Sequence, residues 1–343
     1  MELSARKKAI LSEIVKLYIE TGEPIGSKLL ATRLESAPST ATIRAEMSEL
    51  EKLGFLAQPH TSAGRLPTNR AYRLYVNELM NRETISNDSR EVIDRMLLDI
   101  NPEPESIGSA AAQILTTLTG LPSIYAENIE NGAGMKKVTL LPMGRASVIL
   151  FAITTDGRSR SRLVHCKFPL EAENLNLFLE IAEKNIAGKP LYELNRAYLQ
   201  SITASAGLEA LSLAPLFAAL FDMAEELSKS RINMRGETNL FSLLGSEDTA
   251  RRVLSLFSSS DTAKNILSSA TDSVEVLFGD DTEFPELKPT GMIVATYGNN
   301  TQLGRLAVIG PTRMSYERIL PSVEYLAEKV GNILQEMLKG MEE

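Results

Sequence analysis

Hydrogen-bond donors gather at one point of the sequence, in residues 39–44. Ser39, Thr40 and Thr42 carry hydroxyl groups and Arg44 carries a guanidinium group. Groups of this kind bond to the edges of bases and to phosphates. Acidic residues follow only in 46–51, one or two helical turns later, where they would stand away from DNA. The pattern therefore favours recognition of nucleic acid over chemistry that breaks bonds.

Residues that could catalyse a reaction do not form a known arrangement in this sequence. His165 and Cys166 are adjacent, so in a strand they point to opposite faces and cannot form a Cys–His pair. Residues 131–134 lack the GxGxxG spacing, and residues 280–286 are more typical of a solvated acidic turn than of a cation site. One cysteine and two histidines are too few for a disulfide framework or a structural zinc site. We expect no enzyme activity, metal or cofactor.

The net charge is −8 over the 343 residues, which by itself argues against a nucleic-acid partner. The charge is uneven, however. Residues 1–83 hold 12 Lys and Arg against 10 acidic residues, whereas the remaining 260 hold 24 against 34. Residues 52–77 contain no acid and include Lys52, Arg65, Arg70 and Arg73. Because salt screens charges beyond about 8–10 Å, the local balance matters more to a phosphate backbone than the total.

The length predicts two or three domains. An apolar fraction of 43% with 23% charged residues is typical of a protein that buries real cores. The first residues show no apolar segment of a signal peptide, and the apolar run 213–221 is far shorter than the roughly 20 residues that span a bilayer. We therefore expect a cytoplasmic protein without a membrane segment.

Three helices are predicted in the first part of the chain. Apolar residues recur at helical spacing in 6–20, Gly22 and Pro24 end that helix, and a second helix starts near Ser27. Residues 36–38 break the chain, and Ser39 can cap a third helix, which extends to Leu53. This order predicts a helix-turn-helix whose third helix enters the major groove with its first residues nearest the bases.

Two short strand-like pieces, 55–58 and 65–68, follow and flank a loop of small and polar residues. This is the wing of a winged helix, with His60 and Arg65 near its tip. A helix with two further arginines comes next. The winged-helix domain is expected to occupy residues 1–83. Its predicted DNA contacts are Ser39, Thr40, Thr42, Arg44, His60, Thr61, Ser62, Arg65, Arg70 and Arg73.

The stretches YIETGEPIGSKLL and TATIRAEMSELEKLGFLAQPHTSAGRLPTNRAYRLYV closely resemble the N-terminal domain of the heat-inducible transcription repressor HrcA family. More than two hundred residues later, 310–316 is similar to the family's GPTRM-x-Y signature. The resemblance covers both ends of the chain, and the middle matches in its pattern. Ala45 replaces a usual Asn, Ala71 replaces a usual Gly, and 277–281 departs from an Ile-Gly-Glu-Glu-like segment. Ala45 puts a base contact at that position in doubt.

The rest of the chain predicts a multidomain α+β fold. Residues 84–104 read as a linker helix with a hinge at Asn101-Pro102, and helical character continues to 120. Strands are expected at 137–141, 147–153, 162–168, 273–278, 292–297 and 304–309, in one antiparallel sheet with helices on one side, before a final helix over 316–337. The resemblance implies a GAF-like domain, divided between 105–168 and 246–343 by a largely helical insertion at 169–245.

The insertion carries a rich apolar stripe whose tentative dimer contacts are Leu213, Leu216, Phe217, Leu220 and Phe221. Because so small an insertion buries little apolar surface by itself, the stripe needs a partner surface. One interpretation is that it packs on the chain's own body. The resemblance instead implies an inserted dimerisation domain, which suits a palindromic DNA site.

The resemblance implies a homodimeric repressor of chaperone operons that binds double-stranded DNA at the inverted-repeat CIRCE operator. It also implies inactivation by heat and help from the GroE chaperonin. A small-molecule-responsive repressor with its effector pocket in the GAF-like core is the alternative. A third possibility is a winged helix that serves only as a protein-interaction module.

Overall fold

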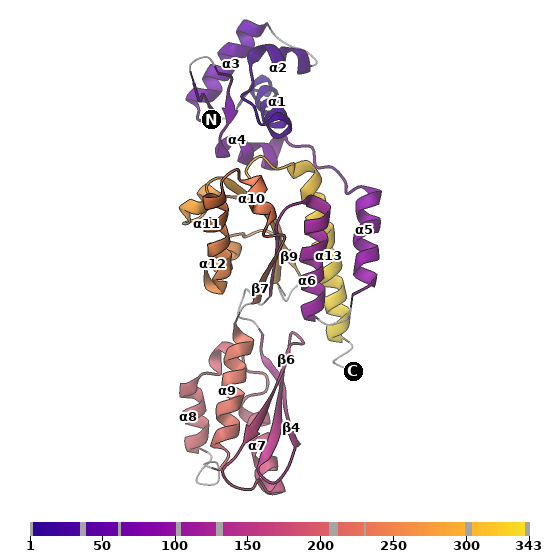
Figure 1. Ribbon diagram of the computed structural model, residues 1–343, viewed down its shortest axis with the longest axis vertical. Helices are drawn as coiled ribbons and strands as arrows, with labels where there is room; N and C mark the ends of the chain where they lie inside the picture. The colour runs from indigo at the N-terminus through magenta and orange to yellow at the C-terminus, as the bar shows by residue number, and fades with distance from the viewer. Residues whose placement is uncertain are drawn as a thin grey trace.

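The computed structural model describes residues 3–34, 39–60, 63–100, 104–127, 133–205, 212–229, 231–298 and 304–339. The chain is a multidomain α+β protein with antiparallel sheets, as predicted. Figure 1 shows an elongated molecule with an N-terminal domain at one end, a core domain in the middle and an inserted domain at the other end. Among the described residues, no helix is long and apolar enough to cross a membrane.

The N-terminal domain is a winged helix, as predicted. Its first helix is capped at its start by the Ser4 side chain and ends at Gly22, whose φ of 69° suits glycine. The predicted break at 36–38 lies outside the described residues. The elements are α1 (Ala5–Thr21), α2 (Ser27–Arg33), α3 (Thr40–Lys52), β1 (Leu56–Ala57), β2 (Leu66–Pro67), α4 (Asn69–Leu74) and a π-helical turn (Tyr75–Leu79).

The core domain contains a five-stranded antiparallel sheet in the order β7-β3-β10-β9-β8. Helices cover both of its faces (Figure 1), rather than one face as predicted. The reason is that β9 and β10 are almost wholly buried, so neither face is left to solvent. The strands are β3 (Ser123–Glu127), β7 (Arg231–Arg235), β8 (Val274–Phe278), β9 (Thr290–Tyr297) and β10 (Gly304–Pro311).

Two hydrophobic clusters lie on the two faces of this sheet. One face packs on α6 (Pro104–Thr119) and α13 (Tyr316–Lys339), which α5 (Asn87–Leu98) covers in turn, and the other on α10 (Asn239–Leu243), α11 (Glu247–Ser258) and α12 (Ser260–Ser268). The predicted linker helix, α5, is part of the core because Ile93 is fully buried and Asp94 accepts a hydrogen bond from Tyr325. The predicted hinge at 101–102 lies outside the described residues.

The inserted domain is a separate unit with its own sheet and hydrophobic cluster. The prediction that its strands join the later strands in one sheet is wrong, because they pair only with one another in the order β4-β5-β6. We therefore draw the insertion at 133–229 instead of 169–245, since β7 and α10 belong to the core. The elements are β4 (Met135–Pro142), β5 (Ser147–Thr154), β6 (Ser159–His165), α7 (Ala172–Asn185), α8 (Arg196–Ser205) and α9 (Ala214–Ser228), with a 3-10 turn at Leu191–Glu193.

The apolar stripe predicted as a dimer contact is the hydrophobic core of this inserted domain. All five side chains are at most 5% exposed and belong to one cluster with the inner face of the β4–β6 sheet. The alternative interpretation, that the stripe packs on the chain's own body, therefore describes the structure. A dimer cannot use these side chains while the domain is folded. They are Leu213, Leu216, Phe217, Leu220 and Phe221.

Candidate nucleic-acid interface

The first turns of α3 present polar groups to solvent. Ser39 caps the helix, because its Oγ accepts a hydrogen bond of 3.2 Å from the backbone N–H of Thr42 and lies 2.9 Å from the Thr42 hydroxyl. Thr40 and Arg44 are exposed. Ile43 and Met47 on the opposite face are buried in the domain. The cap and the buried face thus orient four donor side chains away from the hydrophobic core.

The acidic second half of α3 forms ion pairs with α1. Lys7 Nζ lies 2.7 Å from Glu49 and 3.1 Å from Glu46. Hydrogen bonds to Glu49 and Glu46 raise the pKa of Lys7, and the bond from Lys7 lowers the pKa of Glu49. The glutamates that follow the polar face therefore hold the recognition helix against α1, a role that their sequence position alone does not reveal.

The wing is fastened to the helices at its base. Backbone N–H groups of Ile25 and Arg65 each donate to the other's carbonyl at 2.9 Å, which adds a bridge beside the β1–β2 pair. Gly64 is required there, because a Cβ atom would come within 2.4 Å of the Ile25 carbonyl oxygen. Arg65 Nε donates to Glu51 at 3.0 Å, and only 15% of the Arg65 side chain is exposed. Arg65 therefore lies at the base of the wing, not at its tip as predicted.

A surface groove of about 540 Å³ separates the start of α2 from α3 and the wing. Arg44 lies on one side and Lys28 on the other, and Gln58 and Arg65 contribute from the wing. Lys28 is exposed and was not among the predicted contacts. Its signal in the sequence is its place in the first turn of the helix that precedes the recognition helix, where helix-turn-helix proteins contact the backbone.

Arg70 and Arg73 are held by the protein itself. Arg70 Nη1 donates to the Leu53 carbonyl at 2.9 Å, and its guanidinium lies 4.6 Å from the centre of the Phe55 ring. Arg73 forms an ion pair with Asp281 of the core domain. We therefore do not retain Arg73 among the proposed phosphate contacts, because its guanidinium is paired at the contact between two domains.

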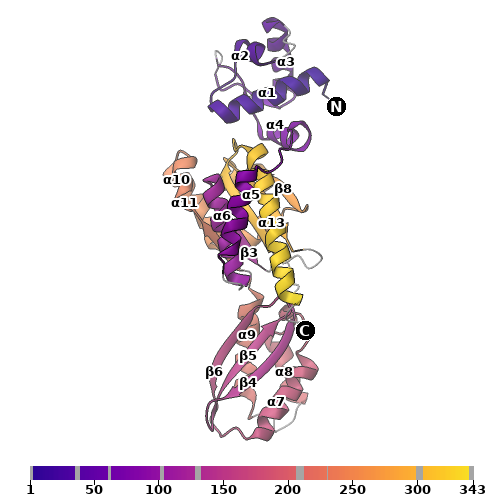
Figure 2. The same ribbon diagram turned by 90° about the vertical axis from the view of Figure 1, so that its right-hand side faces the viewer.

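The remaining predicted contacts belong to the wing. His60 is exposed beyond β1, whereas Thr61 and Ser62 lie outside the described residues. The structure thus brings together Ser39, Thr40, Thr42 and Arg44 on one face, with Lys28 beside them, and directs Arg65 and Arg73 to structural contacts. Helix α3 lies in the part of the domain away from α4, which adjoins the core (Figures 1 and 2).

Comparison with known proteins identifies the family of both parts of the chain. Residues 2–81 match the family model for the HrcA winged helix-turn-helix DNA-binding domain, and residues 105–320 match the HrcA C-terminal domain. HrcA repressors of Clostridioides difficile and Acetivibrio thermocellus are 32% and 28% identical, covering 95% and 98% of this chain and 98% of each relative.

A crystal structure of a hypothetical protein shares the fold, with a TM-score of 0.65 and 22% identity over 98% of this chain and 99% of that one. The chain therefore belongs to the HrcA family of heat-inducible transcription repressors and carries that family's winged-helix DNA-binding domain.

Proposed function

We propose that this repressor acts as a homodimer on the inverted-repeat CIRCE operator upstream of chaperone operons. The observation that carries the proposal is the exposed donor face Ser39–Arg44 at the start of α3. Helix α3 belongs to the domain that lies at the opposite end of the molecule from the inserted domain (Figure 1). The chain's family consists of transcription repressors, not enzymes, so occupation of the promoter is sufficient for its effect.

In this proposal the start of α3 enters the major groove, with Thr40, Thr42 and Arg44 nearest the base edges. Lys28, which lines the surface groove beside Arg44, contacts the DNA backbone. His60, Thr61 and Ser62 of the wing are proposed as further backbone contacts. Arg70 is exposed beside Phe55 and adds positive charge. Residues 84–343 carry 24 Lys and Arg against 34 acidic residues, so their net negative charge adds no attraction for DNA and affinity must come from two correctly placed N-terminal domains.

The open face of the β4–β6 sheet supports the homodimer. The helices of the inserted domain cover only the face formed by Val148, Leu150 and Ala152. The other face, turned towards the viewer in Figure 2, places Leu141 and Leu163 on either side of Ile149. Leu141 and Leu163 are 49% and 51% exposed, and the nearby Met143 and Phe168 are 58% and 67% exposed. A second copy of the same face would cover this apolar surface with two-fold symmetry.

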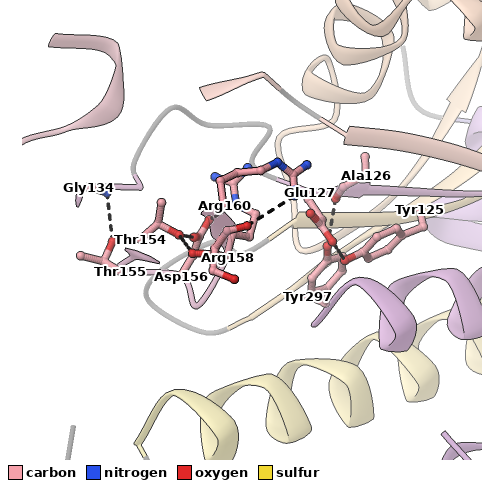
Figure 3. A network of polar contacts seen from close by, with 11 residues as sticks. Tyr125, Ala126, Glu127, Gly134, Thr154, Thr155, Asp156, Arg158, Arg160 and Tyr297 are labelled. Atoms are coloured by element: carbon pink, nitrogen blue, oxygen red, sulfur yellow. Dashed lines mark hydrogen bonds and ion pairs between the residues drawn. The ribbon is translucent and has the colours of Figure 1, made fainter. Parts of the chain in front are cut away.

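The junction between the core and inserted domains supports inactivation by heat. Figure 3 shows the turn of Asp156 and Arg158 beside the end of β3, where Glu127 accepts a hydrogen bond from Tyr125. Arg158 is 4% exposed and donates from Nε to Asp156 at 2.9 Å, but its two Nη atoms find no hydrogen-bond partner among the residues that the structure describes. Burying such donors costs free energy, so this junction is a weak point in a marginally stable protein.

We further propose that the GroE chaperonin helps this repressor to reach its active form, an expectation that comes from the family. Operator binding after refolding, with and without chaperonin, tests it. Equal recovery of binding in both arms would contradict the chaperonin's role while leaving DNA binding intact.

Titration of fluorescent DNA at physiological salt tests the central proposal. An inverted-repeat operator and a scrambled duplex of equal length are compared, with oligomeric state measured on the same sample across a temperature ramp. Strong preference for the inverted repeat is expected, with loss of binding and of the dimer on heating. Equal affinity for both duplexes would overturn the operator assignment.

A cavity of about 480 Å³ favours one second candidate, a repressor that responds to a small molecule. The cavity lies not within the core sheet, as the alternative from the sequence expected, but between residues 83–89 and the start of α13, where Arg313 and Arg318 line it. A thermal-shift screen of metabolites tests this candidate. A compound that raises the melting temperature and changes operator affinity would support it.

A further inference from the structure

The N-terminal domain contacts the core domain through two polar side-chain pairs, and neither pair belongs to the proposed DNA interface. Arg73 forms an ion pair with Asp281, and its Nε donates to the Oδ2 atom of that residue at 3.3 Å. Asn69 Nδ2 donates to Asp280. We call these two pairs the docking contacts. Both donors lie on α4, and both acceptors lie in one short turn after β8.

An aromatic cluster lies beside the docking contacts. The buried Tyr72 ring lies 6.2 Å, centre to centre, from both Phe278 and Tyr316. The Arg73 guanidinium is 5.8 Å from the Phe278 ring centre. Farther along, Tyr75 donates to Glu317 at 2.5 Å. The interface therefore has an apolar centre with directional polar bonds around it, which specify one relative orientation.

The turn that carries the two aspartates is itself rigid. Asp281 accepts a hydrogen bond of 2.9 Å from the backbone N–H of Phe278, which closes the turn. A Cβ atom at Gly279 would lie 1.7 Å from the Leu287 carbonyl oxygen, so the turn is packed tightly on the core. Asp280 and Asp281 are exposed, in line with the solvated acidic turn that the sequence suggested. In addition, the turn accepts hydrogen bonds from α4.

We infer that the docking contacts fix the orientation of each N-terminal domain and thereby determine which half-site spacing the homodimer accepts. The inference rests on the proposed function. The recognition helix and α4 lie at opposite ends of one small domain (Figure 1), so a rotation at α4 displaces the Ser39–Arg44 face. A docked domain accepts one spacing, whereas a freely tethered domain accepts several.

An exchange of the Asn69–Asp280 pair tests this inference without changing side-chain size. Asn69→Asp places two carboxylates against each other, and Asp280→Asn in the same chain restores a carboxylate–amide bond in reverse. Neither residue is among the proposed DNA contacts. Arg73→Gln weakens the second pair, and Arg252→Gln on α11, where Arg252 pairs with Asp248, is the matched control for loss of a positive charge.

Each protein is titrated with three duplexes at physiological salt: the inverted repeat, the same repeat with about 5 base pairs inserted (half a helical turn), and a single half-site. Wild type and Arg252→Gln are expected to bind the lengthened repeat at least tenfold more weakly. Asn69→Asp and Arg73→Gln are expected to reduce that ratio to threefold or less, with half-site affinity within twofold of wild type. The double exchange is expected to restore the wild-type ratio.

If the wild type prefers the inverted repeat but binds both spacings equally well, the inference is overturned and the proposed function stands. The same conclusion follows if Asn69→Asp and Arg73→Gln keep the tenfold ratio. A wild type that shows no preference for the inverted repeat overturns the proposed function and the inference with it. Circular dichroism melts establish that each variant is folded. The double exchange separates orientation from folding, because restored spacing selectivity cannot come from a merely damaged domain.

Discussion

Arg65 Nε and Glu51 Oε2 are 3.0 Å apart and tie the base of the wing to the recognition helix. The two residues come from different elements, and the Glu51 side chain is 34% exposed whereas that of Arg65 is 15% exposed. This contact converts an arginine that a sequence pattern assigns to DNA into a support for the DNA-binding surface. Together with the backbone bridge between Ile25 and Arg65, this ion pair supports the geometry of the groove between Arg44 and the wing.

Loss of this ion pair should loosen the wing. Arg65→Gln and Glu51→Gln are each expected to lower the free energy of unfolding of the N-terminal domain by about 1 kcal/mol, a value reduced for solvent screening. The double variant should cost little more than either single change. Chemical denaturation of the three variants checks this. Additive losses would show that the two side chains act independently.

Arg44 is expected to contribute sequence-specific affinity. Arg44→Ala should weaken operator binding by about 1–3 kcal/mol and relax selectivity at one base pair of each half-site. Titrations against operators substituted at each position measure both effects. A uniform loss over operator and scrambled DNA would instead assign Arg44 to the phosphate backbone.

Lys28 is expected to contribute affinity without specificity. Lys28→Ala should weaken binding to operator and scrambled DNA to a similar extent and lower the slope of log affinity against log salt by about 1 for each half-site. Lys264→Ala, on the α12 helix of the core, is the comparison variant. An unchanged salt dependence would place Lys28 outside the interface.

The open sheet face of the inserted domain should determine the oligomeric state. Leu163→Asp is expected to convert the homodimer to a monomer, because it places a charge in the apolar surface beside Ile149. Leu98→Asp serves as the control, since Leu98 is 85% exposed on α5. Light scattering after size-exclusion chromatography reports the mass. If Leu163→Asp remains a dimer, the contact lies elsewhere.

The turn of Asp156 and Arg158, at the junction of the core and inserted domains, should determine how readily heat inactivates the repressor. Asp156→Ala removes the acceptor of Arg158 Nε and of the Thr154 hydroxyl. It is expected to cost roughly 2–3 kcal/mol, because a buried guanidinium loses its carboxylate. The temperatures of unfolding and of operator release should fall together, whereas the exposed Glu180→Ala on α7 should change neither. A fall in the unfolding temperature without earlier operator release would separate this junction from the heat response.

Local sequence signals identified the winged helix well. The Ser39 cap, the glycine after α1 and the helical spacing of Ile43, Met47 and Leu50 depend on neighbours a few residues away, and the structure has the helices where these signals indicated. The helical character of the chain beyond residue 84 and most strands were also recognisable. Strands β3 and β7 were not assigned, since they are short and pair only with distant segments.

Partnerships between distant residues were beyond the reach of sequence patterns. Residue types mark Arg73 and Arg65 as candidates for phosphate, but tertiary structure pairs them with Asp281 and Glu51 and leaves Lys28 exposed. The stripe at Leu213–Phe221 is apolar on any interpretation, yet only folding shows that the chain's own sheet covers it. Amino-acid sequence alone thus determined most of the elements and the family, because both depend on local order. The tertiary structure decided which charges remain free for DNA, because that depends on which distant side chains meet.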